Sequence, residues 1–389
     1  MKKFPLLTRF LDRIIFVFLD WVFPKDNRII VFGSAAGRAF NGNPRAVFDY
    51  VVASKPDYRP YVFLRDDVVE DEQYAPLEKY LISNKTLRHR FILLKARTLV
   101  GAHGQADFGV RSWSYRKIFI QTWHGRGTKD DGFAFSKYPK KSIRNLKKHN
   151  RLVTAFITAS KVDSGEKARC FNINDRKLFP LGYPRNDFLL KKHIGPGVLT
   201  QGRLPHFNRV VLYSPTYRPY ADSVFFPFED FSVDELNAFL EKHEAIILLR
   251  PHINDRGRHS FDGPRIIDFG FDVCPDVNQV LPEVDILMTD YSSIFLDFLL
   301  MGKPIVFIPY DLKEYESHRG FLYGDYDFWT PGYKAHTFAG LMEEMAKQFS
   351  GRDGYREERA VFNRFFNSGQ SDNSSGKVFR LIEELLQKY

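Results

Sequence analysis

Short runs of apolar and β-branched residues alternate with stretches of helical pattern along the whole chain, and this alternation constrains the fold more than any other feature. Such runs are typical of parallel strands that are buried on both faces and joined by crossover helices. In the first half of the chain we expect strands at 28–32, 61–64, 91–94, 98–101, 117–122 and 155–159. In the second half we expect strands at 210–213, 245–249, 284–288 and 304–308. The segments 44–53 and 377–389 have the pattern of helices.

The chain has 389 residues, of which 44% are hydrophobic, so it is long enough for two domains with separate cores. Between 191 and 207 the composition shifts to Gly, Pro, Thr and Gln, as is typical of a linker. We therefore predict an α/β fold with two Rossmann-like domains that face a cleft, the first at 25–195 and the second at 208–389.

The N-terminal segment 1–24 is apolar but carries charges within its apolar run, at Arg9, Asp12, Arg13 and Asp20. A charge at the centre of a spanning helix costs about 2.5–3.5 kcal/mol, so a helix that crosses the bilayer is disfavoured. On a helical projection the charges gather on one side and most apolar residues on the other. We expect an amphipathic helix that lies in the membrane interface, and the alternative is a surface helix packed on its own domain.

The net charge of +10 favours anionic partners, which are nucleic acid, acidic phospholipid or phosphorylated substrates. No zinc-finger spacing or RNP signature accompanies the charge, so nucleic acid is not expected. A run of Lys and Arg between 137 and 151 is either a solvated basic helix or a contact for anionic lipid or a polyanionic acceptor. Cys170 and Cys274 lie far apart without a CxxC partner, which fits a reducing compartment.

Ligands of open parallel sheets bind outside the carboxyl ends of the strands. Polar clusters directly follow five of the expected strands, at 121–125, 214–218, 250–252, 290–293 and 311–320. This coincidence indicates a ligand site built from strand-end loops more strongly than any single motif does.

Three of these loops carry a histidine, and His124 and His252 follow their strands most closely. His124 lies between Trp123 and Gly125, where its imidazole is suited to accept a proton near neutral pH and where Gly125 lets an acceptor approach the backbone. His252 follows Arg250 and a proline. Taken alone, each histidine is as well explained by a hydrogen-bonded structural role.

The loop at 290–293 opens an apolar helix with Asp290, Ser292 and Ser293, residue types that cap helices and leave N–H groups for phosphate. A serine cap without a ligand is the commoner case. Asp297 within that helix needs buried partners, so it orients loop groups or joins a structural hydrogen-bond network.

Arginines at the strand ends are suited to neutralise charge on a transferring phosphoryl group, and the simpler alternative is that they are solvated. These arginines are Arg218, Arg250 and Arg319. The sequence shows no His/carboxylate cluster at ligand spacing, so we predict no metal site or certain cofactor and leave a divalent-metal requirement open.

Together, these motifs resemble the CDP-glycerol:glycerophosphotransferase family of teichoic-acid and capsule synthesis. The resemblance extends from about Ile29 to the C-terminus and is densest at 122–125, 250–252, 289–293 with Asp297, 319–321 and 331–332. It implies a GT-B-like fold, a donor bound mainly by the C-terminal domain, and monotopic attachment to the cytoplasmic face of the membrane.

The implied reaction moves glycerol phosphate from CDP-glycerol, or a related CDP-polyol, to a hydroxyl of a lipid-linked acceptor and releases CMP. The family motifs place the general base at His124, a second catalytic histidine near the donor pyrophosphate at His252, and a donor-phosphate loop at Ser292 and Ser293. A further donor-side loop falls on His318, Arg319 and Gly320. The choices between glycerol and ribitol, and between primase and polymerase, stay open.

Two other classes of protein are compatible with parts of this pattern. A GT-B nucleotide-sugar glycosyltransferase of cell-envelope polysaccharide synthesis shares the fold and the strand-end sites. A non-enzymatic basic protein that binds nucleic acid or lipid explains the charge and the first helix, but not His124, His252 and the serine loop at strand ends.

Overall fold

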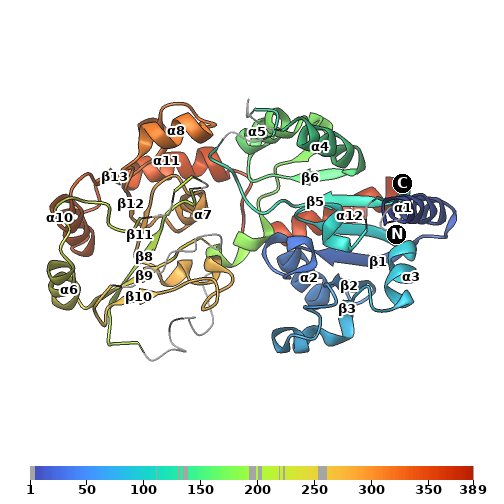
Figure 1. Ribbon diagram of the computed structural model, residues 1–389, viewed down its shortest axis with the longest axis horizontal. Coiled ribbons are helices and arrows are strands. Elements are labelled where there is room, and N and C mark those ends of the chain that lie inside the picture. The colour runs from blue at the N-terminus through green and yellow to red at the C-terminus, as the bar shows by residue number, and fades with distance from the viewer. Residues whose placement is uncertain are drawn as a thin grey trace. The chain divides into compact units, whose positions relative to one another are not determined.

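The computed structural model describes residues 5–388 except 111, 130–131, 135–138, 192–198, 200–203, 219, 222–223 and 253–260, and side chains from residue 14 onward. Lys137 and most of the predicted linker lie outside the described residues. The chain forms two compact units (Figure 1). Unit 1 comprises Met1–Gly125, Asp131–Asp187 and Gly369–Tyr389, and unit 2 comprises Arg126–Asp130 and Phe188–Ser368.

Unit 1 is built on a seven-stranded sheet in which all pairings are parallel, with the strand order β3-β2-β1-β4-β5-β6-β7. The strands are β1 (Asp26–Gly33), β2 (Arg59–Phe63), β3 (Leu81–Ile82), β4 (Ala96–Gly101), β5 (Ile118–Gln121), β6 (Ala155–Ile157) and β7 (Leu178–Phe179). Their central residues are buried, as expected for strands covered on both faces.

The α-helices of unit 1 are α1 (Pro5–Val22), α2 (Gly42–Ser54), α3 (Leu87–Lys95), α4 (Lys140–Leu152), α5 (Lys161–Phe171) and α12 (Ser374–Lys388). Short 3-10 turns connect several elements, at Ala35–Gly37, Glu72–Tyr80, Gln105–Phe108, Asp175–Lys177 and Pro184–Leu190. Helices α2 and α12 pack on the same face of the sheet, where Phe48 and Phe379 join the core around Phe32 and Ile120.

The expected strand at 91–94 is wrong, because these residues lie within α3. Ile92, Leu93 and Leu94 are buried while Phe91 is half-exposed, which is the pattern of a short helix with one apolar side. A four-residue apolar run does not distinguish a strand from a buried helical turn. The chain passes directly from α3 into β4.

The assignment of the C-terminal helix to the second domain is also wrong. Val378, Phe379 and Ile382 of α12 are buried in the core of unit 1, and Lys55 of α2 pairs with Glu383 at 3.2 Å. The apolar face of α12 was expected from its sequence pattern, but the pattern does not say which sheet that face covers.

Unit 2 repeats the same plan with a six-stranded parallel sheet in the order β10-β9-β8-β11-β12-β13. Its strands are β8 (Arg209–Ser214), β9 (Ala245–Leu249), β10 (Ile266–Asp268), β11 (Ile286–Thr289), β12 (Ile305–Phe307) and β13 (Tyr333–Lys334). Its α-helices are α6 (Val233–Lys242), α7 (Ile294–Phe298), α8 (Leu312–Arg319), α9 (Tyr326–Trp329), α10 (Phe338–Phe349) and α11 (Arg356–Asn367).

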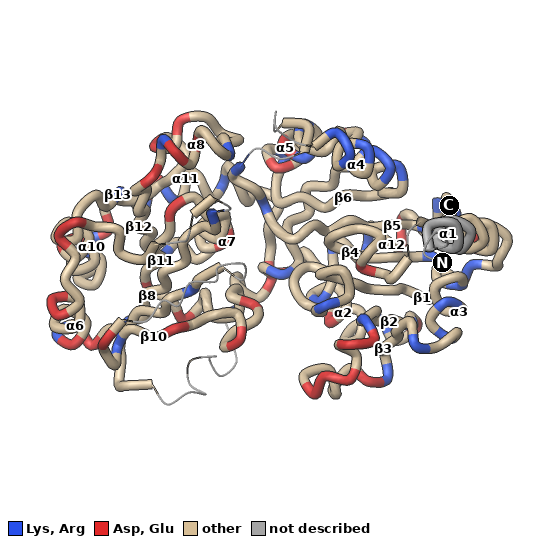
Figure 2. Tube along the Cα trace, in the orientation of Figure 1, with Lys and Arg blue, Asp and Glu red and all other residues tan. Residues whose placement is uncertain are grey.

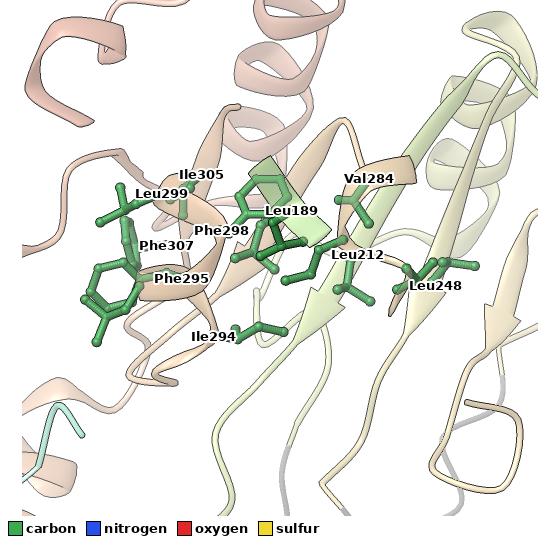
Figure 3. Close-up of a cluster of buried hydrophobic side chains, with 14 of the residues drawn as sticks. Leu189, Leu212, Leu248, Val284, Ile294, Phe295, Phe298, Leu299, Ile305 and Phe307 are labelled. Carbon is green, nitrogen blue, oxygen red and sulfur yellow. The ribbon is translucent and has the colours of Figure 1, made fainter. Parts of the chain in front are cut away.

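Alternate residues of the unit 2 strands enter two different cores, one on each face of the sheet. Leu212 and Leu248 join one cluster, shown in Figure 3, with Phe295 and Phe298 of α7. Val211 belongs to the other cluster. The two-residue side-chain period of a strand therefore explains why these runs are apolar throughout.

A buried carboxylate binds helix α1 to the rest of unit 1. Asp20 is fully buried and pairs with Lys25 at 2.7 Å and with Lys117 at 2.9 Å, and it accepts hydrogen bonds from the main chain and hydroxyl of Ser114. The apolar residues around it point to solvent instead: Ile14, Ile15, Phe18, Leu19, Trp21 and Val22 are all exposed. No helix in the described part of the chain is long and apolar enough to cross a membrane.

Candidate active site

The strand order of each sheet reverses direction between two central strands, β1 and β4 in unit 1 and β8 and β11 in unit 2. Loops that follow such strands at their carboxyl ends diverge and leave room for a ligand.

In unit 1, a buried asparagine holds the loop that carries His124. Asn43, near the start of α2, donates from Nδ2 to the main-chain carbonyls of Thr122 and Trp123 at 2.9 and 3.0 Å. Its Oδ1 accepts a hydrogen bond from the main-chain N–H of Arg185 at 3.1 Å. Trp123 has a φ of 55°, a left-handed conformation that costs a non-glycine residue about 1–3 kcal/mol. The Asn43 contacts stabilise this strained backbone.

Gly125 has a backbone conformation that favours glycine. Its φ is 130°, and a Cβ at this position would lie 2.7 Å from Nη2 of Arg185. Arg185 crosses the loop here and donates from Nη1 to the carbonyl of His124 at 2.9 Å. The positive φ alone explains a glycine at this position, and the approach of an acceptor to Gly125 stays a prediction.

The imidazole of His124 stacks on two other rings. The indole of Trp123 lies 4.4 Å away between centroids, and the imidazole of His103 lies 4.6 Å away with the planes 3° apart. One ring nitrogen of His124 is hydrogen-bonded to the main chain of Ala102. Since a carbonyl fixes the proton on that nitrogen, the other nitrogen is left with its lone pair.

The surroundings of His124 favour its neutral form. Desolvation by the surrounding protein lowers the pKa of His124, and His103, Lys167 and Arg185 lower it further, while the Ala102 hydrogen bond acts in the opposite direction. The ring still meets solvent along part of its surface. His124 is therefore an unprotonated and accessible imidazole, which is the form that a general base requires.

Lys167 supplies buried positive charge next to these rings. Its side chain is 5% exposed, lies 3.7 Å from the carboxylate of Asp163 and is placed over the indole of Trp123 at 5.3 Å. Together with Arg185, it gives the loop around His124 two cations, so this part of unit 1 is suited to an anionic ligand.

In unit 2, Asp290 and Arg218 form a buried structural centre. Asp290 accepts from the main-chain N–H groups of Thr216 and Tyr291, which ties the loops after β8 and β11 together. Arg218 is 2% exposed and pairs with Asp290 at 3.0 Å and bidentately with Asp311. Both were predicted to bind donor directly. Their side chains contact each other and the neighbouring loops, so they position these loops, and the predicted donor contact stays a prediction.

The serine loop lies next to this centre. Ser292 and Ser293 are half-buried at the start of α7, and the Ser293 side chain makes no capping hydrogen bond. Asp297 is buried, and its carboxylate is 3.3 Å from Nδ2 of Asn278, in agreement with the structural network predicted for it. The Ser293 hydroxyl is not used to cap the helix, and both serines stay candidates for a phosphate contact.

Arg250 and His252 follow β9. Arg250 donates from Nη1 to the main-chain carbonyls of Phe269, Gly270 and Cys274, so it organises the neighbouring loop. His252 is exposed, and its ring stacks on that of Tyr217 at 5.0 Å. The predicted role of His252 near a pyrophosphate stays a prediction.

The other predicted donor-side residues lie at the C-terminal end of α8. His318 stacks on Tyr220 at 4.2 Å, and its Nδ1 lies 2.9 Å from the carbonyl of Glu314. Gly320 ends the helix with a φ of 67°, and its N–H donates to the carbonyl of Glu316 at 2.8 Å. Arg319 is half-buried and contributes positive potential at Lys129.

Lys129 was not predicted, although it follows His124 by only five residues and belongs to unit 2. Its Nζ lies over the ring of Tyr315 at 5.4 Å. Burial lowers the pKa of Lys129 to about 8, Asp290 raises it, and Arg319 and Arg218 lower it. Among its contacts with the described residues, none is a hydrogen bond or ion pair of the ammonium group. This ammonium is therefore available to an anion.

A protein-family model matches almost the whole chain and thereby shows the family to which it belongs. Residues 15–384 match the model of the CDP-glycerol:poly(glycerophosphate) glycerophosphotransferases. The chain belongs to this family. This confirms the resemblance carried by the motifs and identifies a glycerophosphotransferase-type enzyme.

Relatives of this glycerophosphotransferase-family chain make teichoic acid. A teichoic acid glycerol-phosphate primase of Bacillus subtilis is 25% identical over 396 residues, which cover 97% of this chain and 96% of the primase. A teichoic acid poly(glycerol phosphate) polymerase of the same organism is 28% identical over 350 residues, which cover 85% of this chain and 45% of the polymerase. The chain thus spans less than half of that relative.

Solved structures share the fold of this chain. The wall teichoic acid polymerase TagF has a TM-score of 0.77 at 21% identity, with 100% of this chain and 99% of that chain covered. A TagF variant soaked with CDPG has a TM-score of 0.79. These likenesses confirm the predicted α/β, GT-B-like fold.

Within the described residues, no group of three or more His, Cys, Asp or Glu side chains is arranged to hold a metal ion. Cations near the predicted loops include Lys167 and Arg185 in unit 1, and Lys129, Arg218 and Arg319 in unit 2. Of these, Arg218 and Arg319 were predicted. The sequence could have pointed to Lys129, because this residue lies shortly after the Trp-His-Gly motif. Nothing in the sequence pointed to Lys167 or Arg185.

Proposed function

We propose that the protein transfers glycerol phosphate, or a related polyol phosphate, from a CDP-activated donor to a hydroxyl of a lipid-linked teichoic-acid or capsule acceptor, and that it releases CMP. The observation that carries the proposal is the neutral imidazole of His124, which is hydrogen-bonded on one nitrogen and has a lone pair on the other, in a member of the glycerophosphotransferase family.

The reaction assigned to this imidazole is an in-line displacement at phosphorus. The acceptor oxygen forms a bond to the phosphorus that carries the polyol, and the bond from that phosphorus to the CMP oxygen breaks. CMP leaves with the bonding electron pair, and the acceptor hydroxyl proton goes to the free nitrogen of His124. Base assistance of this kind contributes about 10²–10⁴-fold to the rate.

The donor phosphates are assigned to unit 2. The Lys129 ammonium makes no ion pair with a described residue, and Arg319 adds positive potential beside it. The half-buried hydroxyls of Ser292 and Ser293 offer neutral donors. Phosphoryl transfer depends mainly on positioning and on charge stabilisation, so cations and hydroxyls suit it without a base in this unit.

Binding of the lipid-linked acceptor is assigned to unit 1, because its surface is suited to a membrane. Six apolar residues of α1 between Ile14 and Val22 are exposed, while Asp20 on the same helix is fixed in the protein. Helix α4 has no buried residue and carries Lys140, Lys141, Arg144, Lys147, Lys148 and Arg151, which appear as a blue helix in Figure 2. An apolar helix and a basic helix suit an anionic membrane surface at its cytoplasmic face.

A donor screen with a lipid-linked acceptor tests this function. CDP-glycerol, CDP-ribitol and UDP- or CMP-linked sugars are supplied separately, and the released nucleotide and the product length are measured. We expect CMP release that requires both a CDP-polyol and the acceptor. Release of UDP from a nucleotide sugar, with none of CMP from either CDP-polyol, would instead identify the glycosyltransferase alternative.

A further inference from the structure

Two imidazoles lie face to face in unit 1, and only one of them belongs to a predicted motif. His103 follows β4 and His124 follows β5, which are adjacent parallel strands whose ends are level, with Gly101 opposite Gln121. The ring centroids are 4.6 Å apart and the planes differ by 3°.

The ring of His103 is held by groups from two loops. Its Nδ1 accepts a hydrogen bond from the main-chain N–H of Ala35 at 3.2 Å and lies 3.7 Å from Oδ1 of Asp107. Neutral His103 therefore carries its proton on Nε2. Asp107 is fully buried and accepts from the main-chain N–H groups of Ala36, Ala102 and His103, at 2.8, 2.8 and 2.6 Å.

This arrangement joins the first loop of the sheet to the base. Ala35 and Ala36 both have left-handed backbones, with φ of 48° and 56°, which are strained for alanine. Their N–H groups are directed to His103 and Asp107 in this conformation. A strained turn, a buried carboxylate and a hydrogen-bonded imidazole thus all fix the ring that covers His124.

We propose that His103 is a positioning residue for His124, whose ring face it contacts and whose unprotonated state it preserves. The inference rests on the proposed role of His124 as the base. The stacked ring restricts rotation of the His124 imidazole away from the Ala102 carbonyl, so the free nitrogen keeps one direction.

The charges around the pair decide which imidazole takes a proton first. Asp107 favours protonated His103, and Arg38 opposes it. At His124, the cations Lys167 and Arg185 oppose protonation, as does His103 itself. Burial lowers the pKa of both rings. Because stacked like charges repel, a proton on His103 further disfavours one on His124.

Three variants separate the ring face from the hydrogen bond. His103→Phe keeps an aromatic face but cannot titrate, His103→Asn keeps an acceptor for the Ala35 N–H but lacks the ring, and His103→Ala lacks both. We expect kcat to fall roughly tenfold in His103→Asn and His103→Ala with an unchanged KM for the CDP-polyol. His103→Phe should recover most of this loss.

The pH dependence gives a readout that a merely structural role would not change. Removing His103 removes one cause that lowers the His124 pKa, so the acidic limb of kcat should move toward neutral pH in His103→Phe and His103→Ala. In parallel, a titration of ¹⁵N-labelled histidine by NMR should place the His124 pKa higher in His103→Phe than in the parent protein.

The outcomes are distinguishable. An unchanged kcat and acidic limb in His103→Ala overturns the inference, and an equal loss in His103→Phe and His103→Ala overturns the role of the ring face. If the parent protein releases no CMP from any CDP-polyol, the proposed function fails instead. The NMR titration needs no turnover, and an unchanged His124 pKa in His103→Phe would still refute the coupling.

Discussion

The side-chain amide of Asn43 donates a hydrogen bond to the main-chain carbonyl of Trp123 at 3.0 Å, and thereby holds the residue before His124 in a left-handed conformation. The base is thus positioned by α2, a helix about 80 residues earlier in the chain. Asn43 is fully buried, so it has no access to solvent as an alternative partner.

Substituting Asn43 with alanine should impair both activity and stability. The change removes the Asn43 donor from the carbonyls of Thr122 and Trp123, which costs about 1–3 kcal/mol in the free energy of unfolding. Misplacement of His124 by about 1 Å should lower kcat by ~10²-fold. Denaturant unfolding and steady-state kinetics measure the two effects. Asn41→Ala is the matched control, because the Asn41 side chain makes no capping hydrogen bond.

Replacement of His124 with alanine should remove the base without unfolding unit 1. We expect CMP release to fall by about 10²–10⁴-fold while the thermal unfolding temperature stays near that of the parent protein. His336→Ala, at an exposed position of unit 2, controls for loss of a histidine elsewhere. Turnover near the parent rate in His124→Ala would refute its assignment as the base.

Lys129 should govern the alkaline side of the pH profile. Its pKa is lowered to about 8, so the ammonium is charged below this pH and is lost above it. We therefore expect kcat/KM for the CDP-polyol to decline above about pH 8. Lys129→Met should raise the donor KM by about 10–100-fold, as expected for loss of a charged hydrogen bond.

The arginine variant sharpens this test. Lys129→Arg keeps the positive charge to high pH, so it should retain donor binding and lose the alkaline limb near pH 8. Lys313→Met, at an exposed position on α8, is the control. An alkaline limb that persists in Lys129→Arg would assign the titration to another group.

The buried carboxylate of α1 should make stability sensitive to acid. Burial alone would raise the pKa of Asp20, but Lys117, Lys25 and Ser114 lower it below its ordinary value of 3.8. A carboxyl with a lowered pKa contributes stability above pH 3.8, and this contribution is lost as the pH falls through the folded-state pKa.

Asp20→Ala should therefore destabilise the protein by about 3 kcal/mol at pH 7, since one partner of a buried ion pair is removed. The difference from the parent protein should shrink below pH 4 in denaturant unfolding experiments. Asp49→Asn breaks the exposed pair with Arg45 and should cost less than ~1 kcal/mol. A difference that stays constant from pH 7 to pH 3 would contradict the pKa direction.

The exposed face of α1 should determine membrane binding. The double variant Phe18→Glu with Trp21→Glu replaces two exposed apolar side chains, each of which contributes about 1.5–3 kcal/mol when buried. Sedimentation with phosphatidylglycerol vesicles should fall at least tenfold. Phe328→Glu changes a residue of unit 2 that is 69% exposed and should have no effect. Equal sedimentation of the double variant and the parent protein would refute the role of α1.

The sheets were largely predictable because parallel strands covered on both faces need apolar residues at every position. This holds for β1 and β9, for example, whose buried runs stand out in the sequence. Strands such as β3 and β13 have only two residues each, so they leave no periodic signal. Tertiary context also decided the helical state of 91–94.

The positions of the candidate site residues were predictable where they follow from a strand end, as for His124 and the loop that starts at Asp290. They were not predictable where they depend on contacts between distant segments. Asn43 and Arg185 meet the His124 loop from α2 and from the turn at Pro184–Leu190. The burial of Arg218 between Asp290 and Asp311 likewise follows from folding, so the sequence suggested a free arginine there.

The position of α12 has a consequence for the order in which the chain can fold. Unit 2 is interposed in the sequence, whereas unit 1 needs Val378 and Phe379 to complete its core. During synthesis, the ribosome must therefore translate the whole of unit 2 before unit 1 can bury the apolar face of its sheet. Until then, nascent unit 1 exposes the part of that face that α12 covers in the folded chain.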